Sequence, residues 1–276
     1  MRPRRQTLAR GIALAPLVAL VALMAACGDD SSLLIPRTPS FTDAQISRDV
    51  AAAAGQAVAL DVVDLLRGEV AAGLTSNAAA SCPYDAASGY HVCPSLTLDA
   101  LTIARRFQFR DASGTAAQSY DASLTASVNF LRTLDGSVSG STSEGLAWTR
   151  GIHETSNRTV SGMAGDETQR VWNGTDIGAD TTVYTGASNS RTYAASVSQT
   201  ATDVVVAVPR SATSWPLSGT VTRVVTAKLT QTSTTAVRNI VRTATVTFNG
   251  TSSVPIVVNG LACTLDLAAA AITGCP

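Results

Sequence analysis

Two cysteines and a histidine come closest to a metal-ligand set in this sequence. Cys82, His91 and Cys93 lie within the stretch CPYDAASGYHVC, and thiolate and imidazole are ligands that zinc prefers. A structural zinc site needs four such ligands, and this stretch supplies three without the spacing of a zinc motif. We therefore expect no metal and no cofactor, because disulfide formation explains the cysteines better.

Residues that could act as acids, bases or nucleophiles show no pattern typical of an enzyme. The G-x-S-x-G motif of serine hydrolases does not occur, and the single lysine, Lys228, has no serine three positions before it. His153 and Glu154 are adjacent, and Asp166 with Glu167 lies in a glycine-containing loop where solvent contact is the simpler expectation. We expect a protein that is not an enzyme and assign no catalytic residue. Glycosidases need only two carboxylates, so an enzyme with an unrecognised carboxylate pair stays open.

Two arginines occupy positions where apolar residues are expected. Arg223 and Arg242 both fall on the apolar phase of alternating segments. An inward arginine can meet an anionic headgroup inside a curved sheet, or its side chain can extend to the solvated rim of the sheet. These two residues are the weak candidates for ligand binding, and the ligand is unknown.

The N-terminus has the layout of an export signal. Four arginines, the last of them Arg10, precede the fifteen uncharged residues 12–26. A basic region followed by a short apolar region is typical of a secretory signal peptide. A spanning helix would need about 20 apolar residues, so residues 1–26 are predicted to be a signal peptide.

The apolar run leads into the stretch LMAAC, which ends at Cys27. This stretch resembles the lipobox of bacterial lipoproteins, in which the cysteine is acylated and the signal is cut just before it. The family usually has leucine three positions before the cysteine, whereas here Met24 occupies that position and Leu23 precedes it. The resemblance implies that Cys27 is the lipidated residue and the mature N-terminus. An ordinary secretory signal with a chance cysteine is the alternative.

The lipobox resemblance also implies a location. Several acyl chains, at ~0.8 kcal/mol per buried methylene, hold a protein on a membrane, so we expect a lipid-anchored protein of the cell envelope. In the family's sorting pattern, a residue other than aspartate after the cysteine favours the outer over the inner membrane, and Gly28 stands there. The membrane is thus the predicted partner, and a protein partner or apolar ligand stays unknown.

The composition of the mature chain argues against nucleic acid as a partner. Of the 20 basic residues, four belong to residues 1–26, which leaves 16 basic against 20 acidic residues. A nucleic-acid-binding domain needs a basic surface, which a mildly acidic chain does not supply. About 250 residues remain after cleavage, enough for one all-β domain. We expect a single domain over residues 41–276.

Four cysteines remain in the mature chain, in two close pairs. Disulfides persist in proteins that leave the cytoplasm, and pairing within each close pair is the simplest of the three connectivities. Each bond would close a loop of roughly 12 residues and contribute ~3 kcal/mol in the chain-entropy model. The predicted disulfides are Cys82–Cys93 and Cys263–Cys275.

A lipidated tether over residues 27–40 and a helix over about 42–72 are predicted next. Thr42 and Gln45 form the T-x-x-Q of a capping box, and apolar residues then recur at helical spacing. The alanine-rich face of this helix predicts close packing against a flat element. Residues 74–95 are predicted to be a loop that the first disulfide closes.

After residue 95 the apolar period changes from 3.6 to 2. The stretch YDASLTASVNFLRTL, residues 120–134, shows the alternation best, and residues 221–230 repeat it. Antiparallel strands are therefore expected from about 96 to 276. Four residue pairs supply the positive φ of two-residue hairpins and are predicted turns: Asp135-Gly136, Asn173-Gly174, Asn249-Gly250 and Asn259-Gly260.

These elements predict a mainly β (α+β) fold. Each strand has one apolar face that another layer must cover. A single long helix covers a wide sheet only if the sheet curls around it, so we expect the N-terminal helix to pack on a curved antiparallel meander sheet. A β-sandwich with the helix outside is the alternative.

Three classes of function remain open after these exclusions. The first is a non-enzymatic envelope lipoprotein that acts as a binding or structural module. The second is a carrier of a lipid or other apolar ligand between helix and sheet, as in periplasmic lipoprotein carriers, whose architecture is similar. The third is the enzyme with unrecognised carboxylates. A hollow lined by Phe107, Phe109 and Phe130 would favour the carrier, and a filled core would favour the first class.

Overall fold

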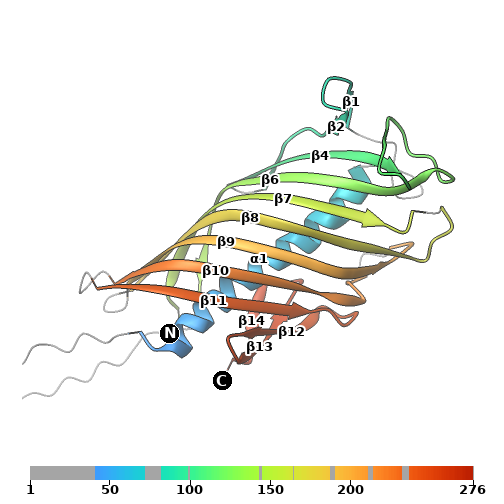
Figure 1. The fold of residues 1–276 in the computed structure, drawn as a ribbon. Helices are drawn as coiled ribbons and strands as arrows, with labels where there is room; N and C mark the ends of the chain where they lie inside the picture. The colour runs from blue at the N-terminus through green and yellow to red at the C-terminus, as the bar shows by residue number, and fades with distance from the viewer. Residues whose placement is uncertain are drawn as a thin grey trace, which may run out of the picture. The chain divides into compact units, whose positions relative to one another are not determined.

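The computed structural model describes residues 41–71, 82–98, 100–142, 145–163, 165–186, 190–210, 214–231 and 236–275. The predicted signal peptide, the lipidation site Cys27 and the tether lie outside the described residues. One helix, α1 (Asp43–Ala71), precedes all the strands (Figure 1). The strands are β1 (Tyr84–Asp85), β2 (Tyr90–Val92), β3 (Leu96–Leu98), β4 (Leu101–Asp111), β5 (Ala116–Ala117), β6 (Thr125–Ser141), β7 (Ala147–Ser161), β8 (Gln169–Thr185), β9 (Arg191–Ala207), β10 (Ser218–Gln231), β11 (Val237–Thr247), β12 (Ser253–Val258), β13 (Leu261–Asp266) and β14 (Ala271–Thr273).

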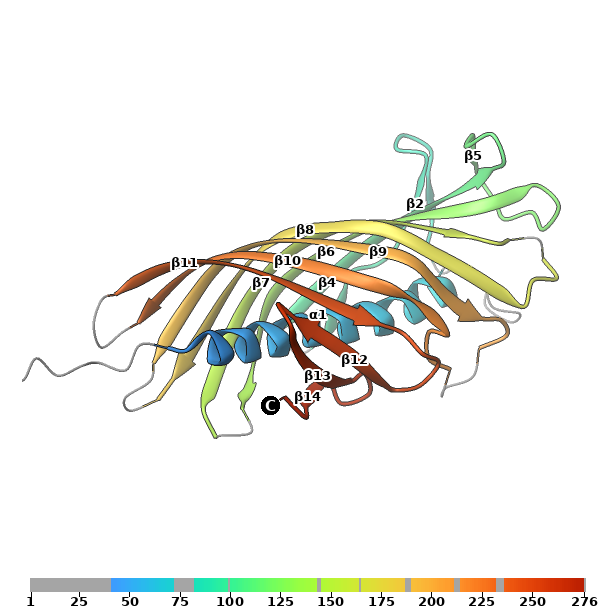
Figure 2. The same ribbon diagram turned by 60° about the horizontal axis from the view of Figure 1, so that its bottom comes forward.

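The strands form a single open antiparallel sheet. From β6 to β14 each strand pairs with its neighbour in sequence, and β4 pairs with β6, while the short strands β2, β3 and β5 all pair with β4. Strands β6, β8 and β9 have 17 residues each, far more than the usual five or six. In Figure 2 the strands β6 to β11 run side by side and bend along their length. The mainly β fold with an antiparallel sheet and one helix is confirmed.

The predicted alternation accounts for the burial of the long strands. In β10, Val221, Val225 and Leu229 are buried, whereas the threonines between them are more exposed. β-branched side chains suit a half-buried pleated surface. The threonines of β10 therefore lie on the outward face of the sheet.

Two of the four predicted turns are wrong. Gly136 lies inside β6 and Gly174 inside β8, where each glycine permits a close backbone approach rather than a turn. A Cβ on Gly136 would lie 2.0 Å from the carbonyl oxygen of Ala100, and one on Gly174 would lie 2.4 Å from that of Asn157. The other two pairs do join strands.

The join between β12 and β13 has the predicted geometry. Asn259 has a φ of 46° and Gly260 a φ of 88°. Positive φ at both central residues is the requirement of a type I′ hairpin. The pair Asn249-Gly250 lies in the connection from β11 to β12, where Gly250 also has a positive φ, 81°.

The helix begins as the sequence predicts. The backbone N–H of Gln45 donates to Thr42 Oγ1 at 3.2 Å, and the backbone N–H of Thr42 donates to Gln45 Oε1 at 3.0 Å. This reciprocal pair is the capping box. α1 contacts β10 to β14. Among the described residues, no helix has both the length and the apolar character needed to cross a membrane.

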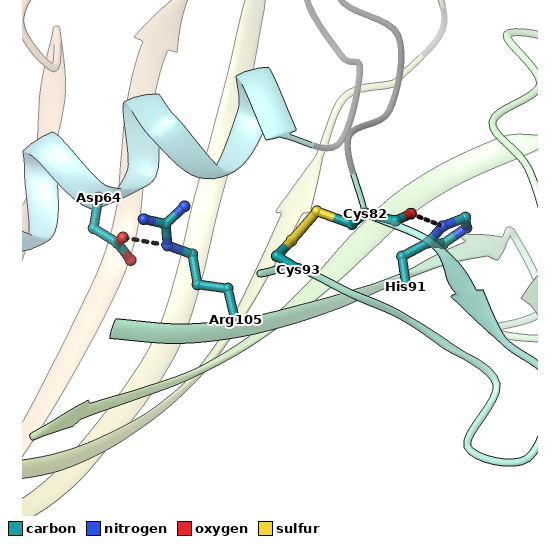
Figure 3. The surroundings of a disulfide bond; sticks show 5 residues. All are labelled: Asp64, Cys82, His91, Cys93 and Arg105. Atoms are coloured by element: carbon teal, nitrogen blue, oxygen red, sulfur yellow. Dashed lines mark hydrogen bonds and ion pairs between the residues drawn. A yellow bond between two sulfur atoms is a disulfide. The ribbon is translucent and has the colours of Figure 1, made fainter. Parts of the chain in front are cut away.

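The structure brings both expected cysteine pairs to disulfide distance. The Sγ atoms are 2.10 Å apart in Cys82–Cys93 (Figure 3) and 2.06 Å apart in Cys263–Cys275. The segment predicted as a loop, 74–95, is described only from residue 82, and it contains the short hairpin of β1 and β2. The predicted loop thus contains two short strands, Tyr84–Asp85 and Tyr90–Val92, joined by a turn.

We expect both disulfides in the native protein. Non-reducing peptide mapping by mass spectrometry should recover one linked peptide that contains Cys82 and Cys93 and another that contains Cys263 and Cys275. Each pair is close in space and in sequence, so local pairing closes the smallest loops. A peptide that joins Cys82 or Cys93 to either C-terminal cysteine, or free thiols at these positions, would contradict the prediction.

Candidate functional site

A row of polar side chains crosses the inner face of the sheet from β4 to β10. Inner here means the face that carries the buried apolar residues of the long strands. The strand register places each member of the row directly opposite the next. All but the first are at most 6 % exposed. The row consists of Arg105, Arg132, Ser156, Asp176, Gln199 and Arg223.

Strand β7 adds three charged residues to the same face. Arg150, Glu154 and Arg158 occur at intervals of four, so the period of two points all three side chains inward. Their exposed fractions are 1 %, 2 % and 6 %. On β8, Asp176 and Asp180 also point inward. Six strands therefore supply a polar network to an otherwise apolar core.

One part of the network surrounds Glu154. Arg223 donates to Glu154 Oε1 at 2.5 Å and to Asp180 Oδ2 at 2.9 Å. Arg150 also pairs with Asp180 and donates to the backbone carbonyl of Ala53 in α1 at 2.7 Å. Two arginines thus hold two strand carboxylates.

A second part of the network centres on Asp61 of α1. Its carboxylate is 2.7 Å from a guanidinium nitrogen of Arg132 and 2.7 Å from one of Arg158. Gln199 Nε2 donates to Asp61 Oδ2 at 2.5 Å. Arg158 and Gln199 both also contact Asp176. Asp61 therefore joins the helix to side chains of three strands.

Two further aspartates of α1 pair with strand arginines. Asp64 Oδ1 is 2.7 Å from Arg105 Nε (Figure 3). Asp49 receives two hydrogen bonds of 2.6 Å from Arg191 and one of 2.5 Å from the hydroxyl of Tyr193. The bidentate arginine geometry is the strong form of a charge-assisted hydrogen bond.

The strands of the network carry more positive than negative charge. Among the described residues of the network, six strand arginines face three strand carboxylates, and three aspartates of α1 supply the missing negative charge. Each of these helix aspartates is 2.7 Å or less from a strand arginine. The arginines are Arg105, Arg132, Arg150, Arg158, Arg191 and Arg223; the strand carboxylates are Glu154, Asp176 and Asp180; the helix carboxylates are Asp49, Asp61 and Asp64.

Two glycines of β8 make room for the long side chains of β7. Gly174 is the register partner of Arg158, and Gly178 is that of Glu154. A Cβ on Gly178 would lie 2.6 Å from Glu154 Cγ, and one on Gly174 would lie 2.8 Å from Arg158 Cγ. The absent side chains let Glu154 extend across β8 to Arg223, which lies on β10. The stretch GTDIGAD, residues 174–180, therefore supplies two inward carboxylates, Asp176 and Asp180, and two glycines that leave space for side chains of β7.

Pairing changes the proton affinity of these buried groups. Burial alone would raise the pKa of Asp61, but attraction to Arg158 and Arg132 outweighs burial and holds that pKa well below its usual range. Burial would lower the pKa of Arg158, and Asp61 and Asp176 raise it above the usual arginine value instead. Burial and the charge of Asp49 raise the pKa of Tyr193. Asp61 and Arg158 are thus held as an ion pair, and Tyr193 keeps its proton.

We expect this network to make stability sensitive to acid. A group whose folded-state pKa is lowered contributes stability above its unfolded pKa, ~3.9 for aspartate, and that stability is lost as the pH falls through the folded-state pKa. The free energy of unfolding should therefore change little between pH 7 and 5 and should drop below about pH 4. Urea unfolding followed by circular dichroism measures this profile. An Asp61→Asn variant should show a shallower acid drop, and an unchanged drop would contradict the role of Asp61.

The structure pairs both arginine candidates with carboxylates. Arg223 is buried and paired, so it neither reaches the rim nor offers a free charge to a ligand. Arg242 lies on β11 outside the part of that strand that pairs with β12, and its Nη2 is 2.8 Å from Asp43 Oδ1 at the start of α1. Both arginines have a carboxylate partner within the chain.

The other chemistry-bearing residues do not come together. His153 is exposed and pairs with Asp135 at 2.9 Å, whereas Glu154 points to the opposite face. His91 Nδ1 lies 3.0 Å from the carbonyl oxygen of Cys82 (Figure 3). Among the described residues, no group of three or more histidine, cysteine or acidic side chains could hold a metal ion.

The sequence predicts that Glu167 is in contact with solvent, whereas the structure pairs its carboxylate. Its carboxylate accepts from Arg170 at 2.7 Å and from the backbone N–H of Gly165 at 2.6 Å. Asp166 beside it is exposed. The pair does not form a two-carboxylate site with the network.

The aromatic residues that could have lined a hollow pack on one another. The ring centroids of Phe107 and Phe130 are 5.8 Å apart, those of Phe107 and Phe109 are 5.4 Å apart, and those of Phe130 and Trp172 are 5.4 Å apart. Two cavities beside the network measure about 30 and 20 Å³. Such volumes hold about one or two water molecules.

Comparisons with known proteins add no relative. No protein-family model matches the chain, and neither a curated protein nor a solved structure matches it.

Proposed function

We propose that this chain is a lipid-anchored protein of the cell envelope whose mature domain is a non-catalytic binding or structural module. The observation that carries the proposal is that every carboxylate of the network contacts an arginine. General acid–base catalysis needs a group with a pKa near the working pH within reach of a substrate. Carboxylates held as buried ion pairs do not meet that need.

We further propose that α1 fills the concave side of the curved sheet. The match between three helix aspartates and three surplus strand arginines supports this arrangement. Close approach at Gly55 supports it too, because a Cβ there would lie 2.7 Å from Ile272 Cδ1. A helix outside a closed sandwich would leave buried strand arginines without partners, which is strongly unfavourable.

A lipid carrier has less support than the non-catalytic module. Pockets for small molecules usually have volumes of about 300–1,000 Å³, whereas the cavities beside the network measure about 30 Å³ or less. The phenylalanines that would line a hollow contact one another instead. A filled interior supports a role for the outer surfaces of the domain.

The lipid anchor is tested by removing the acylated thiol. We expect wild-type protein to enter the detergent phase in a phase-separation assay and Cys27→Ser to stay in the aqueous phase, because several acyl chains dominate the partition. Mass spectrometry of the wild-type N-terminal peptide should show Cys27 as the first residue with acyl chains attached. Equal partition of the two proteins would refute the anchor.

A matched variant separates lipidation from general export. Met24→Leu places leucine at the position where lipoboxes usually carry it, so this variant should be processed and lipidated at least as well as wild type. If Met24→Leu and Cys27→Ser behave alike, the stretch LMAAC acts as an ordinary cleavage site.

A further inference from the structure

A small cavity lies beside the polar row, where β4, β6, β7 and β8 meet. Its volume is about 20 Å³, and its wall includes Arg105, Arg132, Ser156, Arg158, Trp172 and the carboxylate-bearing Asp64. One water-sized particle needs about 10–15 Å³. The cavity therefore accepts a single small particle.

The wall of this cavity has more free donors than free acceptors. Arg105 Nη2, Arg132 Nε, Arg132 Nη2 and Ser156 Oγ have no hydrogen-bond acceptor among the described residues. Arg132 and Ser156 are each 6 % exposed, so bulk water does not serve them. The one carboxylate in the wall, Asp64, is 2.7 Å from Arg105 as an ion pair, and its Oδ1 is a buried acceptor without a hydrogen bond of good geometry. Buried donors without acceptors are unfavourable and call for a partner.

We propose that this cavity binds one small monovalent anion of halide size. Three guanidinium groups and one carboxylate line the cavity, and two of these guanidinium groups also pair with Asp61 behind the wall. A halide accepts hydrogen bonds from all four donors and has no hydrogen of its own to place. A water molecule must also donate two hydrogens, and the acceptors among the described wall side chains are the Asp64 carboxylate and the Ser156 hydroxyl.

The fluorescence of Trp172 can report the binding of an anion in this cavity. Its ring lines the cavity and is 1 % exposed, so free bromide cannot reach it by collision, whereas a bound bromide would quench its fluorescence. We would titrate bromide at constant ionic strength into the full mature chain carrying Cys27→Ser. The expected result is a saturable quenching component that chloride competes away and that Trp172→Phe abolishes.

Two substitutions test the donors directly. Ser156→Ala removes one donor and should weaken bromide binding about tenfold, as expected for a hydrogen bond to a charged partner. Arg105→Lys keeps the charge but removes Nη2, and it should weaken binding to a similar degree. Ser161→Ala, on the outward face of the same strand, is the matched control and should bind bromide like wild type.

Two outcomes would overturn the anion site. Quenching that rises without saturation in wild type would mean that water fills the cavity. Saturable quenching that survives both Ser156→Ala and Arg105→Lys would place the anion elsewhere in the protein.

Discussion

Replacing Asp61 by asparagine should lower the free energy of unfolding by about 3–5 kcal/mol. The substitution keeps the shape of the side chain but removes the charge that Arg132 and Arg158 share, and breaking a buried ion pair on one side leaves an uncompensated charge in the interior. Asp61 is 4 % exposed, so water cannot replace the lost partner. Urea unfolding at pH 7 measures the difference, which is a large part of the 5–15 kcal/mol that stabilises a typical domain.

An exposed aspartate on the same helix provides the control. Asp43 also contacts two arginines, Arg238 and Arg242, but its side chain is 72 % exposed. Surface ion pairs contribute about 0–1 kcal/mol, so Asp43→Asn should change stability little. Equal small effects of Asp43→Asn and Asp61→Asn would mean that α1 does not occupy the concave side of the sheet.

A double-mutant cycle identifies the partner. Arg132→Gln combined with Asp61→Asn removes both members of one pair, and the double variant should lose less stability than the sum of the two single variants. Additive losses would show that the two side chains do not interact in solution.

The local features of this fold could be predicted from sequence because neighbours in sequence determine them. Thr42 and Gln45 set the start of α1 through their own hydrogen bonds, and alternation in residues 221–230 marks a strand without reference to any other strand. The pairs at Gly136 and Gly174 misled the prediction for a physical reason. Positive φ and close backbone approach both select glycine, and sequence alone does not separate the two uses.

The polar network could not be predicted because its contacts depend on register and on distant segments. Asp49 and Arg191 are 142 positions apart, and Glu154 meets Arg223 only because two strands intervene in a fixed register. Charged residues at inward positions also hide the apolar alternation of β7 and β8. One signal was visible: Arg223 on the apolar phase of its strand marked a buried charge whose partner the sequence did not name.

Replacing Gly178 by alanine should cost at least about 3 kcal/mol of stability. The new Cβ would lie 2.3 Å from the carbonyl oxygen of His153 and 2.6 Å from Glu154 Cγ. Overpacking in a well-packed core costs about 1–3 kcal/mol, and displacement of Glu154 from Arg223 adds the larger cost of disturbing a buried ion pair. The backbone of β7 cannot move away without breaking its backbone hydrogen bonds to β8. Relief of the steric strain would therefore also lower the stability of the fold.

Gly151 gives a matched comparison in the neighbouring strand. It lies on the outward phase of β7, and the nearest atom to an added Cβ is the carbonyl oxygen of Thr181 at 3.9 Å. Gly151→Ala meets no obstruction and restricts the unfolded chain, so it should leave stability unchanged or raise it by about 0.4–1 kcal/mol. Urea unfolding of the two variants side by side separates the general effect of alanine from the specific need for space beside Glu154. If Gly178→Ala is as stable as Gly151→Ala, Glu154 does not cross β8 to reach Arg223, and the inner-face network is arranged differently.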